Sequence, residues 1–97
     1  MDYERFHASL VAERPPAGLT PALQALWYDA QDDWAAAHRL AQADDSRAGA
    51  WVHAYLHRKE GDSANAAYWY ARAQRAPGTR PPDEEWRDLV QALLAAT

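Results

Sequence analysis

Two histidines one helical turn apart are the side chains of this sequence with the clearest capacity for chemistry. His53 and His57 stand in the order H-x-x-x-H within the stretch AWVHAYLHRKEGD, residues 50–62. On a helix this spacing places both imidazoles on one side, where two ring nitrogens can bind one metal ion. The H-E-x-x-H pattern of zinc proteases is absent, so the glutamate that serves those enzymes as general base is missing.

A third histidine can join this pair. His38 lies in the helix expected at 34–43, and if neighbouring helical hairpins stack, it should face His53, with Glu60 nearly one further turn along from His57. The three histidines then offer a metal site. The alternative is that they are partly buried imidazoles, hydrogen-bonded to tyrosine or aspartate side chains. Both interpretations remain open at this point.

The same stretch and the helix after it also predict a binding surface. Aromatic rings at helical spacing are typical of a core, and Trp51 and Tyr55 can be explained in that way. In a groove between helices, the same rings would be rigid anchors for a peptide, with basic side chains beside them. The proposed ligand-binding residues are Trp51, Tyr55, Arg58, Lys59, Tyr68 and Arg72.

Other catalytic groups are scarce. The chain has no cysteine, which excludes disulfides, thiol catalysis and thiolate metal ligands. Its four glycines are scattered, three of them at expected breaks between helices and Gly49 near the start of the helix expected at 47–60, so no glycine-rich loop is present to bind phosphate. Ser9, Ser46 and Ser63 fall in helices or caps. We therefore expect no catalytic residue and no cofactor.

The distribution of charge favours an acidic partner. The net charge of −4 argues against nucleic acid as a ligand of the chain as a whole. Residues 1–45 hold three basic and eight acidic side chains, whereas residues 46–80 hold six basic and two acidic ones. Residues 81–97 are acidic again. A basic middle between acidic ends suits an acidic protein segment or the pairing of two copies of the chain.

The elements that position these residues are expected to be helices. The chain has only three valines and no isoleucine, and alanine, the best helix former, is abundant. Prolines at Pro15-Pro16 and Pro77 break the pattern, and Asp33, Ser46 and Asp62 can each cap the helix that follows. Six short helices are predicted, at 3–14, 21–30, 34–43, 47–60, 63–76 and from 83 onwards.

The middle four of these helices form two similar hairpins. Residues 22–41 and 51–70 align at a shift of 29, which places Asp33 on Asp62 and small residues on small residues. Small residues facing each other let two antiparallel helices approach closely. Amphipathic helices at the two ends of the chain would flank the hairpins. The fold class predicted is therefore all-α, with residues 1–97 in a single domain.

The second hairpin resembles a tetratricopeptide unit. The residues that carry this resemblance follow the small, turn, small, aromatic, small order of that motif: Ala54, Gly61-Asp62, Ala66, Tyr70 and Ala73. The resemblance implies paired helices that hold a peptide in a groove. The stretches WVHAYLHRKEGD and NAAYWYARA also resemble a group of small bacterial proteins of uncharacterised function, which implies no activity.

Taken together, these patterns predict a small protein-binding module of adaptor or scaffold type, without catalysis. The alternative is a metal- or small-ligand-binding protein that uses the three histidines. Such a protein could be an enzyme. The N-terminal stretch MDYERFHASL lacks a continuous apolar run, so we expect a cytoplasmic protein with no membrane span.

Overall fold

The computed structural model describes residues 1–96, and in this range it contains α-helices and no strand. The prediction of an all-α fold is confirmed. A short 3₁₀ turn, Ser9–Val11, follows the first helix. The six helices are α1 (Tyr3–Ala8), α2 (Pro21–Ala30), α3 (Trp34–Gln42), α4 (Arg47–Lys59), α5 (Ser63–Ala73) and α6 (Pro82–Ala95).

Two helices end earlier than the sequence predicts. The first was expected to run to Arg14, but the carbonyl of Leu10 accepts a hydrogen bond from the Gln31 side chain at 2.6 Å, and the backbone is extended at Ala12. The fifth was expected to reach residue 76, but Gln74 takes the left-handed conformation at φ 57° and closes the helix. The predicted ends at 14 and 76 are therefore wrong.

The two hairpins, α2–α3 and α4–α5, share one type of turn. The residue with positive φ is Asp32 in the first hairpin and Gly61 in the second, 29 positions later. The next residue caps the following helix: Asp33 accepts a hydrogen bond from the N–H of Ala36, and Asp62 accepts one from that of Asn65. The turns of the two hairpins thus have similar local geometry.

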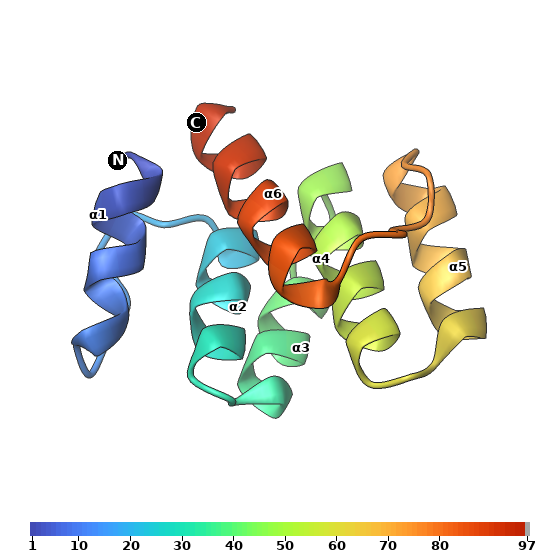
Figure 1. Ribbon diagram of the computed structural model, residues 1–97, viewed down its shortest axis with the longest axis horizontal. Coiled ribbons are helices and arrows are strands. Elements are labelled where there is room, and N and C mark those ends of the chain that lie inside the picture. Colours follow the sequence, from blue (N-terminus) through green and yellow to red (C-terminus); the bar gives the residue numbers. More distant parts are fainter. Residues whose placement is uncertain (97) are drawn as a thin grey trace.

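The helix α4 occupies the middle of the molecule (Figure 1). It packs against α5, α3 and α2, while α6 crosses over α2 and α4 and also touches α1. The indole Nε1 of Trp86 on α6 donates to the carbonyl of Leu26 on α2 at 2.9 Å. The largest fully buried side chains come from α1, α2, α4 and α6: Phe6, Leu23, Leu26, Trp27, Val52, Tyr55, Leu56, Leu89 and Val90.

Among residues 1–96, no helix has both the length and the apolar character that crossing a bilayer requires. The helices instead cover one another through a single main cluster of buried residues, to which Trp34, Trp51 and Trp86 add half-buried rings. A smaller cluster of Ala54, Ala66 and Tyr70 joins α5 to α4. Small residues at this second contact allow the close approach of the two helices.

Candidate metal centre

The structure brings three histidines together, His38 from α3 and His53 and His57 from α4; we call them the histidine cluster. The Nε2 atoms of His38 and His53 are 2.9 Å apart. The ring centroids of the three pairs are separated by 4.6, 4.8 and 5.1 Å. One possible ligand atom from each residue lies within 4.8 Å of the other two. The sequence predicted this convergence from helical spacing and from the stacking of hairpins.

Tryptophans hold the histidine cluster in place from two sides. Trp34, one turn before His38 on α3, stacks on the His38 ring with centroids 4.8 Å apart. Its indole N–H donates to the carbonyl of Leu56 at 3.2 Å, which ties α3 to α4. Trp69 on α5 stacks on His53 at 3.9 Å. Packing of this kind restricts the rotation of the imidazoles, as a site for a ligand requires.

Only one of the two ring nitrogens of His53 has a hydrogen-bond partner among the described residues. Its contact with His38 joins two Nε2 atoms, so one ring must donate and the other accept. The Nδ1 atom of His53 is buried and has no hydrogen-bond partner among the described residues. An unmatched buried polar group costs about 1–3 kcal/mol. A buried imidazole in this condition calls for an explanation beyond packing.

Burial and the neighbouring imidazoles lower the pKa values of two members of the cluster, His53 and His38. The pKa of His53 is lowered to about 4, mostly by burial and in addition by the neighbouring His38 and His57. Burial also lowers the pKa of His38, with a second contribution from His57. A histidine binds a metal through the lone pair of its neutral ring. At pH 7 the lone pair of His53 is therefore available without loss of a proton.

Glu60 fixes the orientation of the third imidazole. Its Oε1 lies 2.6 Å from Nδ1 of His57. When Nδ1 carries the proton in this contact, the lone pair of the neutral ring is on Nε2. A carboxylate that holds a histidine in this way is the usual support of a metal-ligating imidazole. Sequence spacing placed Glu60 near the cluster, and the structure gives it this orienting contact.

The distances in the cluster suit a small transition-metal ion. Zinc–nitrogen bonds of 2.0–2.1 Å in a tetrahedron separate the nitrogens by about 3.3 Å. The observed 2.9 Å between His38 and His53 is a few tenths of an ångström shorter, and the upper limit of 4.8 Å for the cluster is longer. Small side-chain rotations would therefore equalise the three separations. Three imidazoles without a thiolate suit zinc, copper, nickel or cobalt.

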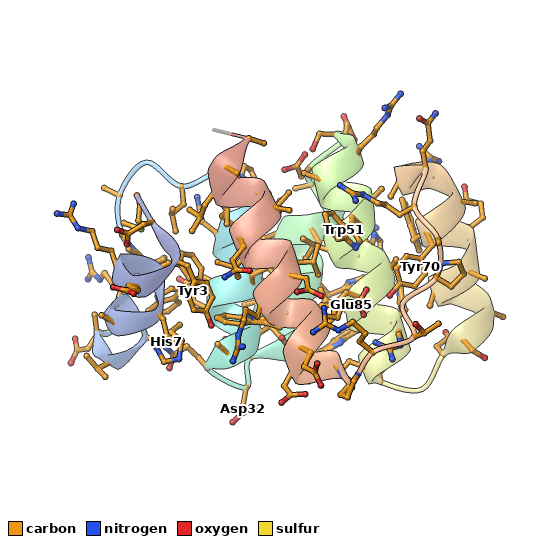
Figure 2. The ribbon with its side chains drawn as sticks, turned by 45° about the horizontal axis from the view of Figure 1, so that its top comes forward. Tyr3, His7, Asp32, Trp51, Tyr70 and Glu85 are labelled. Carbon is orange, nitrogen blue, oxygen red and sulfur yellow. The ribbon has the colours of Figure 1, made fainter. Side chains whose placement is uncertain are left out.

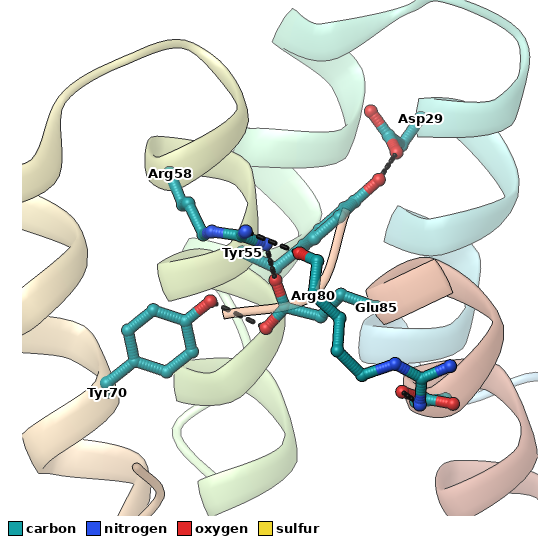
Figure 3. A network of polar contacts seen from close by, with 7 residues as sticks. Asp29, Tyr55, Arg58, Tyr70, Arg80 and Glu85 are labelled. Carbon is teal, nitrogen blue, oxygen red and sulfur yellow. Dashed lines mark hydrogen bonds and ion pairs between the residues drawn. The ribbon is translucent and has the colours of Figure 1, made fainter. Parts of the chain in front are cut away.

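Three of the six residues predicted to bind a partner form polar contacts with other helices of the chain. Tyr55 is 2% exposed, and its hydroxyl donates to Oδ2 of Asp29 at 2.6 Å (Figure 3). Lys59 donates to Oδ1 of the same carboxylate at 2.9 Å. Arg58 forms an ion pair with the buried Glu85 at 2.7 Å and also donates to the backbone carbonyl of Arg80. These three side chains join α4 to α2 and α6.

The other three predicted binding residues lie at the surface. Trp51 is half-buried, and the guanidinium of Arg75 lies 3.8 Å from its ring centroid. Tyr68 is exposed and accepts a hydrogen bond from Arg72 at 3.1 Å. Figure 2 shows Trp51 on α4 beside the α5 helix that carries Tyr70. The structure thus divides the six predicted binding residues into two sets. The inner set is Tyr55, Arg58 and Lys59, and the outer set is Trp51, Tyr68 and Arg72.

Sequence reasoning missed the two acidic residues on which the inner set depends. Asp29 is 2% exposed and Glu85 is 6% exposed. Both oxygens of Glu85 are occupied, Oε1 by Arg58 and Oε2 by the hydroxyl of Tyr70 at 2.6 Å (Figure 3). Charge-assisted bonds of this kind favour the ionised carboxylate. Arg58 and Lys59 at the end of α4 are consequently paired with carboxylates of the same chain.

Comparisons with known proteins supply no relative: no model of a protein family, no curated protein and no solved structure matches the chain. The resemblance of the second hairpin to a tetratricopeptide unit stays a prediction. The function must therefore be inferred from the side chains of this protein and their geometry.

Proposed function

We propose that this protein binds a divalent transition-metal ion, and that zinc is the ion its ligands suit best. The ligands are His38, His53 and His57. One observation carries the proposal: three imidazoles from two helices place a possible ligand atom each within 4.8 Å of one another. Imidazole nitrogens are among the preferred ligands of zinc, and three of them form a common zinc-binding set.

The pattern of hydrogen bonds supports a metal over a purely structural role. The contact between His38 and His53 can hold only one shared proton. Two neutral rings that face each other through their Nε2 atoms compete for that proton. A metal ion would accept the lone pairs of both rings, so neither nitrogen would need to donate.

When bound, the metal would supply a Lewis acid at the surface of α4. The protein contributes the positions of the ligands. Trp34 and Trp69 restrict the imidazole planes, and Glu60 holds the tautomer of His57 that leaves Nε2 free. The low pKa of His53 keeps protons from competing with the metal near neutral pH.

The fourth histidine provides a matched control for this proposal. We expect protein purified without a histidine tag to bind one zinc ion, measured by competition with a chromophoric chelator. The variants His53→Ala and His57→Ala should each bind zinc about 100-fold more weakly, because each removes one of three ligands. His7→Ala should bind as the wild type does, since His7 lies on α1 and stacks on Tyr3.

In the same assay, Glu60→Gln should weaken zinc binding about 10-fold, because it removes the carboxylate that orients His57. Circular dichroism should show that each variant keeps its helices. If His53→Ala, His57→Ala and His7→Ala all bind zinc with the affinity of the wild type, the histidine cluster is not a metal site.

A second candidate function is the binding of an acidic protein segment, which we propose for the outer surface of α4 and α5. Among residues 1–96, Arg47, Arg72 and Arg75 form no ion pair with an acidic side chain. Arg75 and Arg72 lie over Trp51 and Trp69, respectively. A guanidinium on an aromatic ring keeps its N–H groups available to a carboxylate.

The acidic segment can belong to a second copy, because both ends of the chain are acidic. We expect light scattering to detect dimers at low salt and monomers at high salt, as screening weakens contacts between exposed charges. The pair of substitutions Arg72→Glu and Arg75→Glu should abolish the dimers, whereas Arg87→Glu on α6 should not. A monomer at every salt concentration would exclude self-association.

A further inference from the structure

The histidine cluster supplies only three of the four ligands that a structural zinc site has. Within residues 1–96, the cluster comprises His38, His53 and His57. The nearest carboxylates have other partners: Glu60 contacts Nδ1 of His57 at 2.6 Å, and Asp62 accepts the N–H of Asn65 at the start of α5. Zinc sites with three protein ligands keep a further position for water or an external ligand.

Space for such a ligand lies next to the cluster. A cleft of about 100 Å³ includes Ala41, three residues after His38, and Ala50, three residues before His53. Trp69 lines the same cleft and stacks on His53, so the cleft begins about one helical turn from the cluster. His38 itself is half-buried, which gives the cluster access to solvent.

The charges in the cleft favour an anion once a metal is present. Asp44 and Asp45 line the cleft, but so do Arg47 and Arg72, so the negative and positive charges of the lining are equal in number. The carboxylate of Asp44 is also occupied by the N–H of Ala22 and by Ser46. A divalent ion in the cluster would then leave the region positive.

Arg72 is the cation best placed to assist. Its guanidinium lies 5.3 Å from the ring centroid of Trp69, the same ring that stacks on His53. Its one hydrogen bond to another side chain in the described residues is to the hydroxyl of Tyr68, at 3.1 Å. No acidic side chain in that range neutralises it. The tryptophan therefore links a metal ligand to an arginine available for binding.

From these contacts we infer that the metal ion keeps one coordination position open to a small anion, such as a carboxylate, and that Arg72 strengthens the binding of that anion from the cleft. This inference rests on the proposed metal-binding function. It assigns to Arg72, one of the residues that the sequence singled out, a role in holding a small ligand. The ligand would be small because the cleft beside the cluster is small.

Cobalt(II) in place of zinc makes both metal binding and anion binding visible, because its absorption in the visible range reports the number and geometry of its ligands. The wild-type protein should give a cobalt spectrum in the absence of added anion. Titration with sodium azide should then change that spectrum in a saturable way. Arg72→Gln should weaken azide binding about 5-fold through the loss of one nearby positive charge and should leave cobalt affinity unchanged. Arg75→Gln is the matched control, because Arg75 lies over Trp51 instead.

The possible failures can be told apart. If cobalt binds and azide leaves its spectrum unchanged, the open position is refuted while the metal site stands. If Arg72→Gln and Arg75→Gln weaken azide binding equally, the assigned role of Arg72 is wrong. If the protein yields no cobalt spectrum and binds no zinc, the proposed metal-binding function fails, and the inference fails with it.

Discussion

Replacement of Glu85 by alanine is expected to lower the free energy of unfolding by about 3–5 kcal/mol, the usual effect of removing one partner of a buried ion pair. The carboxylate is 6% exposed and accepts from Arg58 at 2.7 Å and from Tyr70 at 2.6 Å. Without it, the Tyr70 hydroxyl stays buried without its acceptor, and Arg58 loses its counterion. The substitution also leaves a space between α4, α5 and α6.

Urea unfolding followed by circular dichroism measures this effect. Glu85→Gln, which keeps the size of the side chain and loses its charge, should lower the free energy of unfolding less than Glu85→Ala does. In a Tyr70→Phe background, Glu85→Ala should have a smaller effect than in the wild type, because the hydroxyl to be satisfied is gone. A loss below about 1 kcal/mol for Glu85→Ala would show that the pair contributes little.

The replacement of Gly49 by alanine is expected to lower the free energy of unfolding by about 3 kcal/mol, at the upper end of the range for overpacked sites. Alanine within a helix normally stabilises it by about 1 kcal/mol relative to glycine. At Gly49, however, a Cβ atom would lie 2.1 Å from the carbonyl oxygen of Asp44 and 2.6 Å from its Cβ. The first turn of α4 would have to move away from the segment that precedes it.

That movement would also disturb Asp44, whose carboxylate accepts hydrogen bonds from the N–H of Ala22 and from Ser46. Thermal and urea unfolding of Gly49→Ala measure the loss. Ala48→Gly is the control for helix propensity in the same turn of α4, with an expected loss of about 1 kcal/mol. A Gly49→Ala variant more stable than the wild type would mean that propensity outweighs the steric contact.

The helices could be predicted because their signals are local. Asp33, Ser46 and Asp62 cap helices in the structure as their positions in the sequence indicate. The two wrong ends have causes that act over longer distances or through rare backbone conformations. Gln31 takes the carbonyl of Leu10 from 21 positions away, and a left-handed glutamine such as Gln74 has no sequence signal.

The same difference between local and long-range signals applies to the candidate site. The pair His53 and His57 follows from helical spacing, and His38 joins it because α3 packs against α4. The ion pairs of Arg58 and Lys59 depend on acidic residues of other helices, which charge counts do not locate.

A signal for those acidic residues was nevertheless present. Glu85 precedes the buried residues Leu89 and Leu93 by four and eight positions, on the apolar face of its helix. Asp29 follows Ala25 and Leu26 in the same manner on α2. Carboxylates on a buried face require partners, and Arg58 and Lys59 at the end of α4 are those partners in the fold.

The crossing of α6 over α2 and α4 has a consequence for the nascent chain. Both hairpins leave the ribosome before α6 does, and the hydrogen bond of Trp86 to Leu26 joins residues that are 60 positions apart in the chain. Until translation reaches that point, the faces of α2 and α4 that α6 will cover remain open to chaperones and proteases. We therefore expect the new molecule to gain resistance to proteases once α6 has been synthesised and packs on these faces.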